Sequence, residues 1–194
     1  KQITGLRLEF FEHASLPGNG PGRGTVLEEG NFMLNEIVVQ SISPPDARLS
    51  APYPVVGASA DSFHKHLHPG LAADGDRETG WSIQLDKGAP QHAVFEFQEP
   101  IRLAEGERLK VTLVQNHIHT HTIGRFRVSL TASGGPLTAS GLTAQLEDIL
   151  LDSKVAPTGE EEGLLKRFFL SQSPDLEEQH LKIADLRASL PEYS

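Results

Sequence analysis

The sequence predicts a mainly β protein, an antiparallel β-sandwich followed by a C-terminal α-helical appendage. Three observations support this. Short apolar runs alternate with polar residues in the first part of the chain, and turns rich in Gly and Pro separate them. Apolar residues at helical spacing occur only beyond residue 140. We therefore expect two parts, a β-sandwich over 1–140 and a helical connector over 141–194.

The β part contains several runs of strand type with no helical segment between them. In 125–130 apolar and polar residues switch at every step, which is the period of a strand with one buried face. The turn segment 16–23 is rich in Gly and Pro and punctuates two of the runs. Five strands are expected, at 3–11, 32–42, 92–97, 109–114 and 125–131.

The C-terminal part has helical periodicity and most of the negative charge. Residues 142–151 and 160–170 carry apolar residues at helical spacing. Ser173 and Pro174 form a helix start, and Pro191 ends the apolar face that follows. From residue 141 onward there are 5 Lys and Arg against 11 Asp and Glu, a net charge of −6. We expect these helices to dock on the sandwich or on a neighbouring domain.

Composition excludes several classes of function. The chain has 17 Lys and Arg against 26 Asp and Glu, which argues against a nucleic-acid partner. No stretch reaches the roughly 18 apolar residues of a membrane span. There is no Cys, so thiolate zinc sites and the Cys-x-x-Cys-His haem motif are excluded. The sequence has no nucleophile elbow, P-loop or dinucleotide fingerprint, so we expect no enzyme. Because the chain starts at Lys1, we expect an excised fragment or a mature form.

The most specific local feature is the segment DGDRETGW at 74–81. Two aspartates flank a Gly, and a Thr hydroxyl follows three residues later. A tight turn there can bring carboxylates and carbonyls together, and Ca²⁺ requires six to eight such oxygens. The candidate calcium ligands are Asp74, Asp76 and Thr79. The alternative is a polar turn that leads into a strand beginning at Trp81.

Histidine forms a second pattern. The runs 64–68 and 117–121 each have His at alternating positions, which a strand would place on one face. Neighbouring imidazoles can bind Zn²⁺, Cu²⁺ or Ni²⁺, with a carboxylate or water completing the site. The alternative is a pair of polar loops whose imidazoles hydrogen-bond locally. A His-based metalloenzyme is the third function that we consider.

The segment 74–81, lying before a VFEF strand at 94–97, resembles the discoidin-type, galactose-binding-like jelly-roll superfamily. Coagulation-factor C-type domains and many carbohydrate-binding modules share that fold. The resemblance implies a structural Ca²⁺ held by oxygens of this loop, at Asp74, Asp76 and Thr79. It also implies that Trp81 packs beneath the loop.

A second resemblance covers nearly the whole chain. The order of motifs is similar to a binding module of planctomycete-type multidomain cytochrome c proteins. The resemblance implies an exported parent protein, periplasmic or extracellular, in which a helical segment leads to the next domain. The motifs are ITGLRLE at 3–9, SLPGNGPGR at 15–23, GNFMLNEI at 30–37, DGDRETGW at 74–81, HAVFEF at 92–97, LKVTLVQ at 109–115 and GRFRVS at 124–129.

These resemblances lead to the expected function, a non-catalytic module that binds carbohydrate through its loops. Sugar sites combine aromatic platforms with planar hydrogen-bonding side chains. Aromatic residues make up only 6% of the chain, so strong binding is not expected. The alternative is a scaffold that contacts adjacent domains and has no small ligand. The candidate ligand-binding residues are Tyr53, Arg77, Gln115, Asn116, His119 and Arg125.

Overall fold

The structure is a computed structural model of the whole chain. Its description covers residues 2–26, 28–83, 91–117, 120–140, 142, 146, 149–150, 156–172, 176, 179 and 182. Two compact units make up the chain, Lys1–Gly141 and Leu142–Ser194, and each is described by itself.

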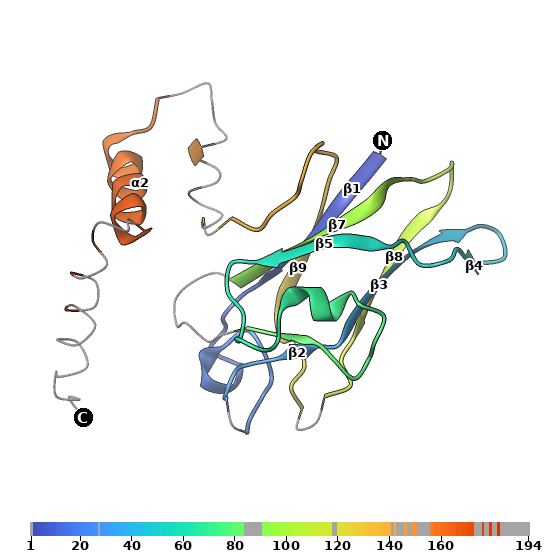
Figure 1. Ribbon diagram of the computed structural model, residues 1–194, viewed down its shortest axis with the longest axis horizontal. Helices are drawn as coiled ribbons and strands as arrows, with labels where there is room; N and C mark the ends of the chain where they lie inside the picture. The colour runs from blue at the N-terminus through green and yellow to red at the C-terminus, as the bar shows by residue number, and fades with distance from the viewer. Residues whose placement is uncertain are drawn as a thin grey trace. The chain divides into compact units, whose positions relative to one another are not determined.

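The first unit is built from antiparallel strands (Figure 1). One sheet has four strands in the order β5-β7-β1-β9, a second has three in the order β4-β3-β8, and β2 pairs with β6. The strands are β1 Gln2–Phe10, β2 Met33–Leu34, β3 Glu36–Ser43, β4 Arg48–Leu49, β5 Val55–Ala60, β6 Trp81–Ser82, β7 Gln91–Arg102, β8 Arg108–Val114 and β9 Phe126–Thr131. Two short 3-10 helices, η1 Pro17–Asn19 and η2 Pro69–Ala72, lie in the connections.

The predicted fold class is confirmed: the protein is mainly β, its sheets are antiparallel, and a helix follows them. All five expected strands are present, although the run 32–42 is divided between β2 and β3. The sequence analysis missed β5, whose sequence VVGASA has a Gly and two Ala in place of large apolar residues.

The core lies between the four-stranded and three-stranded sheets. In β1, Leu6, Leu8 and Phe10 alternate with polar residues and are at most 1% exposed, as the period of a strand requires. Trp81 is fully buried, and its ring lies edge-on to Phe10 with centroids 5.3 Å apart. The sequence analysis expected Trp81 to be structural, and its burial agrees with that expectation.

The apolar face of β9 is not buried as the sequence analysis expected. Phe126, Val128 and Leu130 share one face, but they are 46%, 38% and 49% exposed. The reason is that β9 is an edge strand, which pairs only with β1 among the strands described. Alternation predicts which side chains share a face, but it does not predict how far the opposite sheet extends.

In the second unit, helix α2 runs over Gly159–Gln172 and confirms the helix expected at 160–170. A capping box starts it: the Thr158 N–H donates to the Glu161 carboxylate at 2.7 Å, and the Glu161 N–H donates back to the Thr158 hydroxyl. The helices expected at 142–151 and 174–190 fall largely outside the described residues. None of the described helices has the length and apolarity needed to cross a membrane.

Candidate functional site

The loop between η2 and β6 gathers oxygen atoms around one hydroxyl. The Thr79 Oγ1 atom lies 2.9 and 3.1 Å from the two carboxylate oxygens of Asp74. It also lies 2.9 Å from the backbone carbonyl oxygen of Asp76 and 3.1 Å from that of Leu71. A hydroxyl has one proton and can donate only one strong hydrogen bond, so most of these oxygens face the Thr79 oxygen without a hydrogen between them.

Two turns inside the loop produce this arrangement. The Asp74 carboxylate accepts the N–H of Asp76 at 2.9 Å, and the Asp76 carboxylate accepts the N–H of Glu78 at the same distance. Gly75 has a φ of +83°, which lets the chain reverse between the two aspartates. Asp76 therefore presents its backbone carbonyl to the oxygen cluster, while its carboxylate closes its own turn.

Glu36, the first residue of β3, adds a carboxylate beside this loop. It is 7% exposed and accepts the N–H of Gly75 at 3.2 Å. Burial raises the pKa of Glu36 above its ordinary value, and the nearby Asp74 charge raises it further. A cation placed among these oxygens would relieve both effects.

Asn35 connects the loop to the end of β8. Its side-chain Nδ2 donates to the backbone carbonyls of Arg77 and Thr79 at 3.1 and 3.0 Å, and its Oδ1 accepts the N–H of Asn116 at 2.7 Å. The sequence analysis assigned no role to Asn35 or Glu36. The available signal was that these two polar residues interrupt an apolar segment between Phe32 and Ile37.

The donor set of this loop fits Ca²⁺. Carboxylate, carbonyl and hydroxyl oxygens are the groups that this ion uses, whereas transition metals favour nitrogen or sulfur. The described residues contain no group of three or more His, Asp or Glu side chains arranged to hold a metal. A calcium site here would therefore depend on the backbone carbonyls of Leu71 and Asp76 together with Asp74 and Thr79.

Of the predicted ligand-binding residues, Arg77 and Asn116 are brought together. Both are exposed, and their backbones are bonded to opposite ends of the Asn35 amide. Gln115 lies next to Asn116, but its side chain accepts the N–H of Ile123 and so closes the connection between β8 and β9.

Tyr53 and Arg125, two further predicted ligand-binding residues, have other surroundings. Tyr53, the aromatic residue among these candidates, is half-buried against the core. The guanidinium of Arg125 lies 5.7 Å from the ring centroid of Phe11, at the start of β9. His119 lies outside the described residues.

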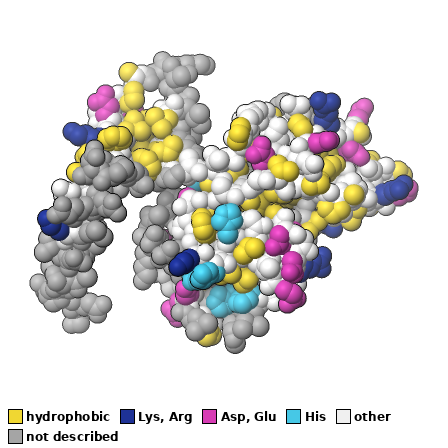
Figure 2. All heavy atoms as spheres, viewed as in Figure 1, with side chains coloured by type: hydrophobic (Ala, Val, Ile, Leu, Met, Phe, Trp, Pro, Cys, Tyr) yellow, Lys and Arg dark blue, Asp and Glu magenta, His cyan; other side chains and the backbone are white. Residues whose placement is uncertain are grey.

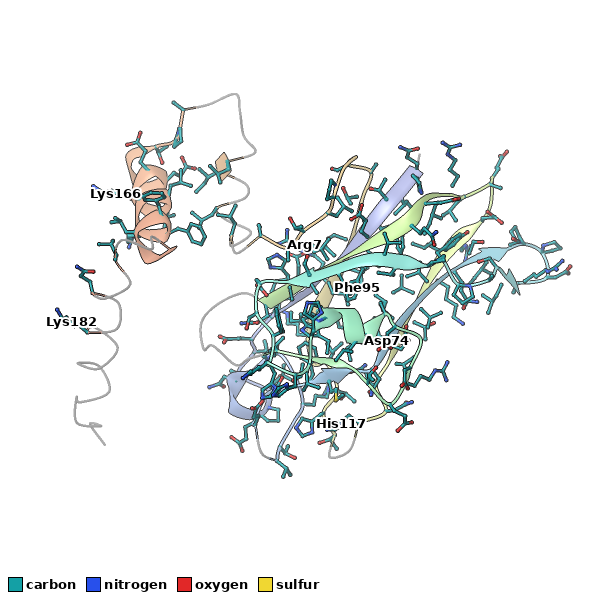
Figure 3. The ribbon with its side chains drawn as sticks, in the orientation of Figure 1. Arg7, Asp74, Phe95, His117, Lys166 and Lys182 are labelled. Atoms are coloured by element: carbon teal, nitrogen blue, oxygen red, sulfur yellow. The ribbon has the colours of Figure 1, made fainter. Side chains whose placement is uncertain are left out.

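A second feature at the loops is a cavity of about 190 Å³ lined by histidines from both runs. The described parts of both runs are loops, so the polar-loop alternative holds there and the one-sided strand does not. Figure 2 shows His side chains gathered on the lower part of the visible face, and Figure 3 places His117 and Asp74 toward the same end of the view. The lining residues are Glu28, Asn31, Phe32, Met33, His64, Leu67, Ser82, His117 and His121.

The polar wall of this cavity is organised by Asn31, which is 2% exposed. Its Nδ2 donates to the Glu28 carboxylate and, at 3.1 Å, to the Ile83 carbonyl. Its Oδ1 accepts the Phe32 N–H at 2.7 Å and the Ser82 hydroxyl at 3.2 Å. The orientation of the Glu28 carboxylate is thus set by a buried network.

A row of charged residues crosses the outer face of the four-stranded sheet. Glu9 is 6% exposed and pairs with Arg127 through two hydrogen bonds of 2.6 Å. The Arg127 hydrogen bonds, opposed in part by burial, hold the pKa of Glu9 below its ordinary value. Beside Glu9 in the sheet register, His92 donates its backbone N–H to Asp61 at 3.0 Å and contacts it through Nδ1 at the same distance.

Comparisons with known proteins identify no relative. No protein-family model matches this sequence, and no curated protein or solved structure is detectably similar to it. The resemblances to discoidin-type domains and to the cytochrome c modules therefore remain predictions.

Proposed function

We propose that this chain is a non-catalytic binding module whose loop 74–81 is held in shape by Ca²⁺. The observation that carries the proposal is the group of carbonyl and carboxylate oxygens within 3.1 Å of the Thr79 hydroxyl oxygen. Bare oxygens this close repel one another, and a divalent cation would offset that repulsion. Asp74, Thr79 and the carbonyls of Leu71 and Asp76 would hold the ion.

The ligand class that we propose is carbohydrate. Arg77 and Asn116 present a guanidinium and an amide at the edge of the loop, and both groups hydrogen-bond well to sugar hydroxyls. The Asn35 amide fixes both backbones, so little backbone conformational entropy would be lost on binding. The role of Ca²⁺ would be to keep this edge in place, without taking part in chemistry.

Internal pairing of ionisable groups favours binding over catalysis. Of the described residues, Glu9 is occupied by Arg127, and His92 and Asp61 are paired with each other on the sheet. A general acid or base would need its proton-transfer atom within reach of a substrate. From the resemblance stated above, we infer an exported multidomain parent protein.

Affinity electrophoresis on a broad panel of polysaccharides, together with a glycan array, tests this function. The wild-type chain should be retained by at least one glycan in the presence of Ca²⁺. The double variant Arg77→Ala/Asn116→Ala should lose retention, and Arg48→Ala, an exposed change in β4, should not. Failure to bind any member of the panel would contradict a carbohydrate ligand.

One observation favours a scaffold as the second candidate. On α2, the neighbouring large apolar residues Phe169 and Leu170 are 68% and 40% exposed. A neighbouring domain could cover them. A Phe169→Ser/Leu170→Ser variant that weakens association with an adjacent domain of the parent protein, with glycan retention unchanged, would support the scaffold.

A further inference from the structure

The histidine-lined cavity has features that the proposed function does not use. His64 belongs to the first His run and His117 and His121 to the second, yet all three line one cavity together with the Glu28 carboxylate. The fold thus brings together imidazoles that are more than 50 residues apart in the sequence. Aliphatic and aromatic groups from Phe32, Met33 and Leu67 line the rest of it.

The spacing of two of these rings suits a shared ion. The ring centroids of His117 and His121 are 5.6 Å apart, and the rings are inclined by 78°. A metal–nitrogen bond of about 2.0–2.1 Å with tetrahedral angles holds the centroids of two liganding imidazoles roughly 5 Å apart. The observed separation is therefore close to the one that two imidazoles bound to one ion would have.

The carboxylate and backbone around the cavity are already ordered. Asn31 orients Glu28 from a buried position, as outer-shell residues orient metal-ligating carboxylates. The backbone of His64 is bonded to Ser82 at 3.0 Å, and that of His121 to Met33 at 3.0 Å. The backbones of two of the three histidines are thus anchored beside the cavity that they line.

From this arrangement we propose that the cavity binds a divalent transition-metal ion such as Zn²⁺, with His117 and His121 as ligands and with His64 and Glu28 completing the site. Imidazole with carboxylate is a donor set for Zn²⁺, Cu²⁺ or Ni²⁺ and not for Ca²⁺. The described side chains are not already gathered at coordinating distance. Binding therefore includes closure of the rings around the ion. The site is separate from the oxygen cluster of loop 74–81.

Calorimetric titration of tag-free protein with ZnCl₂ tests the proposal. The wild type should bind one ion per chain in this cavity. His121→Ala should weaken binding by at least about tenfold, since removing even an outer-shell partner typically costs 10–100-fold. The control His13→Ala removes an exposed imidazole that bonds Ser15 outside the cavity, and it should bind zinc as the wild type does.

A second measurement covers the case in which His121→Ala unfolds the protein. The imidazole NMR signals of His64, His117 and His121 in the wild type should shift on adding zinc, while that of His13 should not. Excess Ca²⁺ should not reverse the shifts, so this result is independent of the calcium proposal. The proposal is overturned if these signals do not respond, or if the triple variant His64→Ala/His117→Ala/His121→Ala binds zinc as tightly as the wild type.

Discussion

The buried side chain of Asn35 donates a hydrogen bond to the backbone carbonyl of Thr79 at 3.0 Å. Through this contact a residue in the connection between β2 and β3 holds the loop that carries the proposed calcium ligands. The same amide reaches the backbones of Arg77 and Asn116. One side chain that is 3% exposed thus bonds two carbonyls of loop 74–81 and joins them to the sandwich.

Asn35→Ala should destabilise the protein strongly, because it leaves three backbone groups without their partner. The expected loss is about 2–4 kcal/mol of unfolding free energy, from buried groups that each cost about 1–3 kcal/mol when unsatisfied, less what water can recover. Urea unfolding followed by Trp81 fluorescence measures it. Asn116→Ala is the matched control, since Asn35 bonds only its backbone N–H, and it should change stability by less than about 0.5 kcal/mol.

Gly22→Ala should also be severely destabilising. A Cβ at Gly22 would lie 2.1 Å from the Asn31 carbonyl oxygen, so the backbone beside the histidine-lined cavity would have to move. We expect a loss of about 2–4 kcal/mol, in the range of strong overpacking. Gly134→Ala, where no atom lies within 4 Å of the new Cβ, should be almost neutral. Equal losses in the two variants would contradict this packing.

The Glu9–Arg127 pair should make stability depend on acid pH. The pKa of Glu9 in the folded protein is held below its ordinary 4.5, chiefly by the Arg127 hydrogen bonds and further by the Arg7 charge. The unfolded chain therefore takes up a proton first as the pH falls. The stabilisation is fully present above about pH 4.5 and is lost as the pH drops through the lower, folded pKa.

Arg127→Met should weaken this dependence, while the Arg7 charge still lowers the pKa of Glu9. It should lower stability at pH 7 by about 1–2 kcal/mol, a value reduced because the Arg127 side chain is 55% exposed. Between pH 3 and 7, the unfolding free energy of the variant should fall less steeply as the pH is lowered. Arg125→Met is the control, because Arg125 stacks on Phe11 and has no described bond to Glu9. The same dependence of unfolding free energy on acid pH in the wild type and in Arg127→Met would contradict the role given to Arg127.

Glu36→Gln should change the melting temperature differently in the absence and in the presence of Ca²⁺. Burial and the Asp74 charge raise the pKa of Glu36, so its ionised form is unfavourable without a cation. The variant should melt at a slightly higher temperature than the wild type in chelator. In Ca²⁺ it should gain less stability than the wild type, because one negative charge beside the ion is gone. A larger calcium-dependent gain in Glu36→Gln would show that this carboxylate does not face the ion.

The fold class followed from local patterns, because alternation and Gly-rich turns act over a few residues. The same patterns could not predict the exposed face of β9 or the half-burial of Tyr53. Both depend on how far a strand distant in the sequence extends. Spacing within 74–81 brought Asp74, Asp76 and Thr79 forward as candidates. It did not predict that Asp76 presents its carbonyl and not its carboxylate, or that the Leu71 carbonyl joins the cluster.

The supporting residues of both sites could not be predicted in this way. Asn35 bonds backbone groups that lie 42, 44 and 81 residues further along the chain, and no local pattern encodes such contacts. The two His runs were visible as candidates, but their convergence on one cavity with Glu28 depends on the packing of three separate loops. The sequence alone indicated candidate site residues, and the structure showed which of the described ones lie close together.

The central claim is that loop 74–81 binds Ca²⁺ through oxygens around Thr79, and differential scanning calorimetry tests it most directly. The wild type should melt at a higher temperature in Ca²⁺ than in a calcium chelator, as expected when an ion binds only the folded state. Asp74→Asn and Thr79→Val should lose most of this difference, and Glu78→Gln should keep it. A wild-type melting temperature that is the same in Ca²⁺ and in chelator would contradict the account.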